Sequence, residues 1–128
     1  MGKKEGGNIL KSEEILKVII EAADDKLAED IIAMDVKDLT VLSDYFVVTN
    51  GRNDRQMAAI VQGIVQAAGK NNIPIKNVEG KDSGKWTLID LNGVIVHVFS
   101  SDERSYYNLE KLWSDAPLVD IREWVSEQ

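Results

Sequence analysis

Apolar residues follow helical spacing in two long stretches of this chain. Isoleucine, leucine, valine and alanine recur every three or four positions over residues 12–26 and again over 54–70. This spacing places the apolar side chains on one face, so both stretches are expected to be amphipathic helices. Ser12 is the expected N-cap of the first helix, and Asn53 with Gln56 resembles a capping box at the start of the second.

Short apolar runs, most of them rich in β-branched residues, indicate five strands. They are residues 31–36, 45–49, 75–79, 85–91 and 94–99. The last two runs flank Asn92-Gly93, a dipeptide that favours a tight hairpin with a type I′ turn. Hairpin strands are antiparallel, so the expected sheet is not purely parallel.

A third helix is expected to begin at Ser101. Its apolar side carries residues at helical spacing: Tyr106, Leu109, Leu112 and Trp113. Pro117 ends this region, and the tail has apolar spacing for one short helix. The expected order is α-β-β-α-β-β-β-α, an α/β fold with helices packed on a mixed sheet of about five strands. We divide the chain into a flexible N-terminal arm (1–11), one domain (12–116) and a tail (117–128).

The hairpin register separates its side chains onto two faces. The face expected in the core carries Thr87, Ile89, Leu91, Val94, Val96 and Val98. The second face pairs Asp90 with Ile95, Leu88 with His97, and Trp86 with Phe99. Two interpretations stay open: either a helix covers this second face, or the face is an exposed apolar patch with polar groups. Such patches mark interaction sites, and tryptophan beside a charge is typical of binding hot spots.

Charge and composition disfavour several classes of protein. The 128 residues fit one domain, and 15 Lys and Arg against 22 Asp and Glu give a net charge of −7. That charge disfavours broad nucleic-acid binding and favours a basic protein partner. The absence of cysteine excludes disulfides and thiolate catalysis. With no apolar run long enough to span a membrane and no secretory signal, we expect a cytoplasmic protein.

Catalytic and metal-binding chemistry has little support in the residues. His97 and Asp90 have the residue types of a general base and its orienting group, but no G-x-S-x-G nucleophile motif is present. An interface or internally satisfied histidine is therefore favoured. A single histidine without cysteine predicts no metal site. The turn Asn50–Arg55 joins a strand to a helix N-terminus and could hold an anion. A nucleotidyl- or phosphoryl-transfer enzyme using this turn is the alternative function.

Several motifs taken together carry a family resemblance. They are DYFVVTNG (Asp44–Gly51) followed by Arg55-Gln56, then Glu79-Gly80, GKWTLID (Gly84–Asp90), VIVHVF (Val94–Phe99) and YYNLEKLW (Tyr106–Trp113). In this combination the chain resembles the ribosomal silencing factor family, also called Iojap-like. The resemblance extends from about Glu14 to Ala116 and leaves the tail after Pro117 outside.

The resemblance implies a nucleotidyltransferase-like fold without catalytic carboxylates, and therefore no enzyme and no cofactor. It implies binding to the large ribosomal subunit through a basic protein, universal ribosomal protein number fourteen. That contact would block joining of the small subunit and repress translation when nutrients are scarce. It also implies a homodimer when the protein is free of the ribosome, and a structural homodimer that hides the apolar patch is a further possibility.

The partner-binding residues implied by the resemblance are Trp86, Leu88, Asp90 and His97. They lie on the second face that the hairpin register singles out. Tyr107 is added because it projects about 100° around the expected helix from Tyr106, which leaves one of the two tyrosines exposed.

Overall fold

The computed structural model describes residues 10–80, 85–100 and 115–126. Within these ranges the chain forms α1 (Ser12–Asp25), β1 (Glu29–Asp35), β2 (Tyr45–Gly51), α2 (Asp54–Lys70), β3 (Ile75–Glu79), β4 (Trp86–Leu91) and β5 (Val94–Ser100). The third helix expected from Ser101, and Tyr107 with it, lie outside the described residues.

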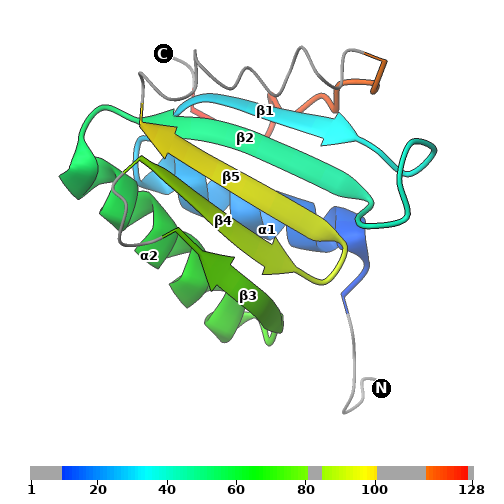
Figure 1. Cartoon of the computed structure of the whole chain (residues 1–128), viewed down its shortest axis with the longest axis horizontal. Coiled ribbons are helices and arrows are strands. Elements are labelled where there is room, and N and C mark those ends of the chain that lie inside the picture. The colour runs from blue at the N-terminus through cyan, green and yellow to red at the C-terminus, as the bar shows by residue number, and fades with distance from the viewer. Residues whose placement is uncertain (1–9, 81–84, 101–114, 127–128) are drawn as a thin grey trace.

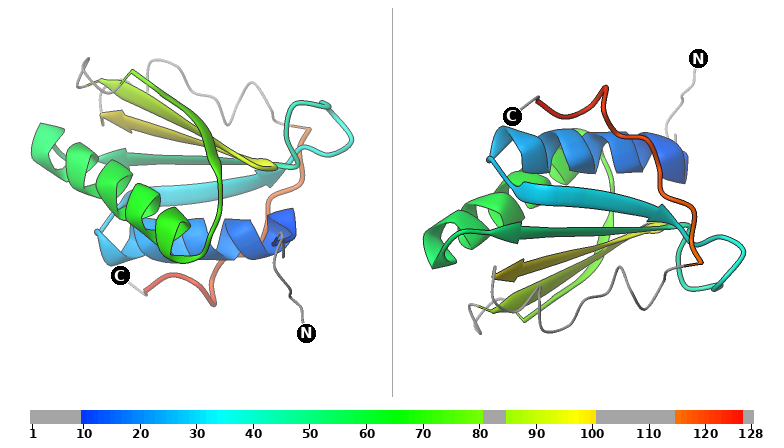
Figure 2. Two further views of the ribbon diagram at one scale, coloured as in Figure 1. Left: turned by 90° about the horizontal axis from the view of Figure 1, so that it is seen from below. Right: turned by 90° about the horizontal axis from the view of Figure 1, so that it is seen from above.

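The five strands form one mixed sheet in the order β1-β2-β5-β4-β3 (Figure 1). Only the central pair, β2 with β5, is parallel, and the other three pairs are antiparallel. Both described helices lie on the same face of the sheet (Figure 2). The predicted α/β class and mixed sheet are therefore confirmed.

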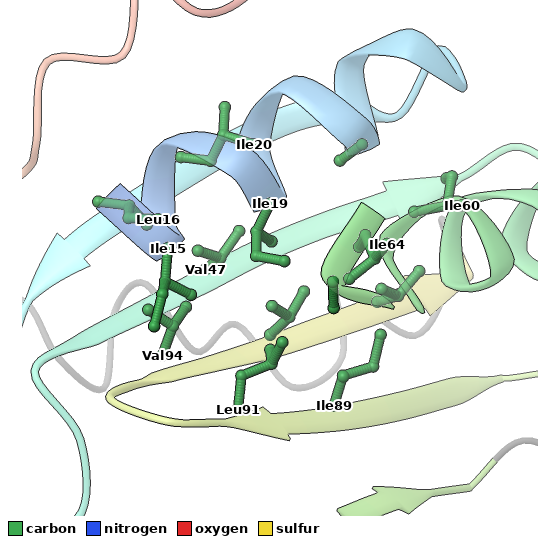
Figure 3. Packing of buried hydrophobic residues seen from close by; sticks show 14 of the residues in the cluster. Ile15, Leu16, Ile19, Ile20, Val47, Ile60, Ile64, Ile89, Leu91 and Val94 are labelled. Carbon is green, nitrogen blue, oxygen red and sulfur yellow. The ribbon is translucent and has the colours of Figure 1, made fainter. Parts of the chain in front are cut away.

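The main core fills the space between the two helices and this face of the sheet (Figure 3). The helices contribute the apolar positions on which their prediction rests, among them Ile15, Leu16, Ile19, Ile20, Ile60 and Ile64. The sheet contributes Val47 and the predicted core face of the hairpin, including Ile89, Leu91, Val94, Val96 and Val98. Burial of this apolar face stabilises both helices far more than their intrinsic propensity does.

The predicted hairpin register is confirmed, but the predicted turn type is wrong. Trp86 pairs with Phe99 and Asp90 with Ile95, as expected. A type I′ turn needs positive φ at both central residues, whereas here only Gly93 has it, at 88°. Tertiary contacts explain the difference. The Gly93 carbonyl accepts hydrogen bonds from two backbone N–H groups that lead into β2, and a Cβ on Gly93 would lie 2.9 Å from Ser12 Cβ.

The two helix starts differ from their predicted caps in detail. The first helix begins at Ser12 with Lys11 as its N-cap, so Ser12 is not the cap. The Ser12 hydroxyl instead donates to Asp44 Oδ2 at 2.7 Å and so ties the helix start to the segment before β2. In the second helix, Asn53 is the N-cap as predicted, and its side chain accepts from the N–H of Gln56 at 2.8 Å.

The C-terminal residues 115–126 fold back along the domain, and we call this segment the strap. Leu118 bridges Met34, and backbone hydrogen bonds of 2.9 Å on either side pair the strap with the outer edge of β1. Its apolar side chains, Val119, Ile121, Trp124 and Val125, pack against the main core. Ser126 bonds the Asp24 carboxylate near the end of α1. Where one short helix is expected, the strap makes a single turn at 122–124, and the Trp124 N–H donates to the Ile121 carbonyl at 2.8 Å.

Candidate functional site

The sheet face opposite the helices carries a cluster of stacked rings, which we call the aromatic face. It consists of Phe46 from β2, Trp86 from β4, and His97 and Phe99 from β5. The His97 ring lies nearly parallel to the Phe99 ring at 6.2 Å and to the Trp86 ring at 6.3 Å between centroids. Phe46 meets His97 edge-on at 5.7 Å. Both geometries are favourable for aromatic pairs, so the rings hold one another in place.

The strand register explains why these rings meet. Trp86 is directly opposite Phe99, and His97 lies two residues before Phe99 on the same face of β5. On the neighbouring parallel strand, Phe46 is in register with Ile95. Alternation along each strand therefore brings all four rings to one side of the sheet.

The aromatic face has a buried part and a half-exposed rim. Phe46 and Phe99 are buried together with aliphatic neighbours that complete a second apolar cluster: Met34, Val36, Val48 and Ala116. Trp86 and Ile95 are only partly buried and pack against this cluster from its margin. The second face is therefore divided, since part of it belongs to the protein's own core and part is half-exposed.

Of the predicted partner-binding residues that the structure describes, three lie in the half-exposed rim and one is buried. Trp86, Leu88 and Asp90 are half-buried at neighbouring positions on β4, on one side of the strand. His97 is buried and lies beneath them as a support for Trp86. The prediction missed Phe46 and its aliphatic neighbours. The run YFVVT could have indicated Phe46, because it is apolar at positions that face both sides of the sheet. The structure buries every residue of β2.

His97 is suited to packing and poorly suited to catalysis. Burial lowers the pKa of His97 to about 4, because the charged imidazolium would lose its hydration. Its Nδ1 accepts a long hydrogen bond, 3.4 Å, from the indole Nε1 of Trp86, and this bond requires the neutral ring. A general base needs access to a substrate proton, whereas this nitrogen points at the indole. The arrangement disfavours the His97–Asp90 pair as an acid–base device.

The turn from β2 into α2 is organised around the carboxylate of Glu29. Asn50 Nδ2 donates to Glu29 Oε1 at 2.9 Å, and Arg52 Nε lies 4.0 Å from Glu29 Oε2. The adjacent cavity, of about 400 Å³, is lined by Leu27, Ala28, Glu29, Asp30 and Arg52. The two carboxylates repel a phosphate, and the side chains of Asn53 and Gln56 already accept hydrogen bonds from two N–H groups near the helix start, those of Gln56 and Arg52. The geometry therefore disfavours the predicted anion site.

The described residues contain neither a candidate metal site nor a candidate membrane-spanning helix. Across residues 10–80, 85–100 and 115–126, no three His, Cys, Asp or Glu side chains gather closely enough to hold a metal ion. In the same part of the chain, no helix combines the length and apolar character needed to cross a bilayer.

Comparison with known proteins shows to which family this chain belongs. The model of the family described as "Ribosomal silencing factor during starvation" matches residues 9–128. The chain is 49% identical over 112 residues to the Ribosomal silencing factor RsfS of Bacillus subtilis, which covers 88% of this chain and 95% of that protein. The chain belongs to the ribosomal silencing factor family. The family match includes the strap, so the expectation that the resemblance ends at Ala116 was wrong.

Solved structures agree with this assignment. A crystal structure of a Bacillus halodurans protein matches with a TM-score of 0.76 at 42% identity, covering 84% of this chain and 98% of that one. A crystal structure of a Chromobacterium violaceum protein, CV0518, matches with a TM-score of 0.80 at 35% identity, covering 82% and 88%. The fold of this silencing factor family member is thus also that of experimentally determined structures.

Proposed function

We propose that this chain is a cytoplasmic ribosomal silencing factor that binds the large ribosomal subunit and sterically prevents the small subunit from joining. Family membership, with a relative of the same name at 49% identity, supports the function. The observation that supports the place of binding is the half-exposed rim of the aromatic face at Trp86, Leu88 and Asp90. The proposed action is occupation of a surface, without chemistry or cofactor.

The rim combines the properties of a protein-binding hot spot. The Trp86 ring is stacked on buried neighbours, so little side-chain freedom remains to be lost on binding. Leu88 adds apolar area beside it, and Asp90 adds a negative charge. We propose a basic ribosomal protein, universal ribosomal protein number fourteen, as the partner, since a net charge of −7 steers the chain toward basic surfaces. The proposal includes a homodimer in the free state.

Mixing purified subunits tests this function. Added protein is expected to sediment with large subunits in a density gradient and to reduce the fraction of large and small subunits that join. The control is protein added to small subunits alone, with which it should not sediment. Failure to sediment with large subunits, or binding that leaves subunit joining unchanged, would contradict the proposal.

The substitution Asp90→Lys tests the charge at the rim. We expect the association rate with large subunits to fall on the order of threefold at low salt, and the salt dependence of that rate to weaken. Stopped-flow measurements over a range of salt concentrations give both quantities. Glu21→Lys is the matched control, because it makes the same charge change at an exposed position on α1, on the other side of the sheet. Equal effects of the two substitutions would place Asp90 outside the interface.

A further inference from the structure

The loop between β1 and β2, residues 36–44, carries three exposed large aliphatic side chains, including the two most exposed in the described residues. Val41 is fully exposed, Leu42 is 74% exposed and Leu39 is 44% exposed. Leu118 of the strap is 70% exposed and pairs with Met34, two residues before this loop. Figures 1 and 2 show the loop and the start of the strap meeting at the same end of β1. We call Leu39, Val41, Leu42 and Leu118 the loop patch.

Hydrogen bonds within the loop hold its backbone in this shape. The N–H groups of Leu39 and Thr40 donate to the Val36 carbonyl at 3.0 and 3.1 Å. The N–H of Leu42 donates to Thr40 Oγ1 at 3.1 Å, and the Ser43 hydroxyl donates to the Tyr45 carbonyl at 2.9 Å. Several backbone and hydroxyl groups of the loop are thus hydrogen-bonded, while the side chains of Leu39, Val41 and Leu42 are exposed. A preformed apolar surface of this kind loses little conformational entropy when a partner covers it.

The charges around the loop patch favour a basic partner. Lys37, the only cation in the loop, is held by the protein itself: its Nζ lies 3.0 Å from the Tyr45 hydroxyl and 3.4 Å from Asp35 Oδ2. Asp38 in the loop and Asp115 at the start of the strap are exposed. Apolar side chains beside exposed carboxylates complement a basic protein surface with an apolar recess, and they repel the phosphates of RNA.

The loop patch and Trp86 lie at opposite ends of the sheet. Tyr45, directly after the loop, is in register with Val94 at the start of β5. Trp86 is opposite Phe99, near the end of β5. One small site cannot include both, so the loop patch is a separate surface from the Trp86 end of the aromatic face.

We propose that the loop patch is a second docking surface of this protein, and that its occupant is a basic protein of the large ribosomal subunit. This inference rests on the proposed function. A second contact at the loop patch, at the other end of the sheet from Trp86, adds to the contact at the rim and resists rotation of the domain about it. A protein that blocks subunit joining sterically needs a fixed orientation on the large subunit.

The double substitution Val41→Ser with Leu42→Ser tests the second surface. Affinity for purified large subunits is expected to fall at least about tenfold, because two exposed aliphatic side chains would no longer be buried. The fold is expected to be unchanged, since the hydrogen bonds of the loop involve neither side chain. The matched control is Leu27→Ser, which removes a 65% exposed leucine between α1 and β1 and should leave the affinity unchanged. Unchanged affinity of the double variant would overturn the inference.

The experiment separates this inference from the proposed function. If the unaltered protein binds large subunits and Trp86→Ala weakens that binding while the loop variant does not, the loop patch fails and the function stands. If the unaltered protein does not bind, both fail. A photo-crosslinking residue in place of Val41 identifies the occupant on purified large subunits. Crosslinking to a basic ribosomal protein supports the inference, whereas crosslinking only to ribosomal RNA or to a second copy of this chain overturns it.

Discussion

Replacing Trp86 by alanine is expected to weaken binding to the large ribosomal subunit by about 2 kcal/mol or more, which is roughly thirtyfold in affinity. The physical reason is the placement of the indole, which is half-buried and stacked against His97 and Phe99 so that its remaining surface is rigid. A rigid aromatic side chain contributes a large contact area at small entropic cost. Titration of labelled protein with purified large subunits measures the affinity.

Two controls separate binding from folding for Trp86. Thermal unfolding shows whether Trp86→Ala remains folded, since the indole also packs on the second apolar cluster. Trp124→Ala removes another partly buried indole, one that packs from the strap against the main core on the opposite side of the sheet. The Trp124 variant is expected to lose some stability and to keep its affinity. Full-strength binding by a folded Trp86→Ala protein would place the docking surface elsewhere.

Acid is expected to destabilise the protein through His97. The pKa of His97 is about 4 in the folded protein and 6.5 when the side chain is in water, because burial disfavours the charged ring. As pH falls from 6.5 toward 4, the unfolded chain takes up a proton on this histidine that the folded chain does not. The free energy of unfolding therefore decreases over this window, by about 3 kcal/mol in total, and it is unaffected by His97 above pH 7.

The substitution His97→Gln isolates this effect, because the chain has only one histidine. Glutamine keeps a hydrogen-bond acceptor for the Trp86 indole but does not titrate. Urea unfolding of both proteins at pH values from 7 to 4 is expected to show the original protein losing about 3 kcal/mol relative to the variant. Any constant cost of the substitution cancels in that comparison. Curves that stay parallel over the whole range would show that His97 is protonated equally in the folded and unfolded states.

Local sequence patterns predict much of the fold because they act over short distances. Helical spacing predicts both ends of α2 correctly and the ends of α1 to within one residue. Alternation of side chains on either side of Asn92-Gly93 predicts the hairpin register and the face that lies in the core. The paired residues of the second face follow from the same alternation. The face on which Trp86 lies could therefore be anticipated from the hairpin alone, but its half-exposure could not.

The errors arise where distant segments meet. The turn at Gly93 is shaped by its contacts with Ser12 and with the segment entering β2, which Asn-Gly propensity does not include. The strap pairs with β1, from which it is separated by most of the domain, so no local signal predicts this pairing. Burial of the second face depends on Phe46 and Ala116, which come from two further parts of the chain.

The strap pairs with part of one edge of the sheet, and this pairing is missing while the chain is still being synthesised. The outer edge of β1 has backbone groups that would otherwise recruit strands from other molecules. Residues 117–119 occupy part of that edge, but the ribosome makes them long after β1. Nascent or prematurely terminated chains that lack the strap would present an open template for intermolecular pairing. Once the whole chain is translated, pairing with the strap removes that part of the template.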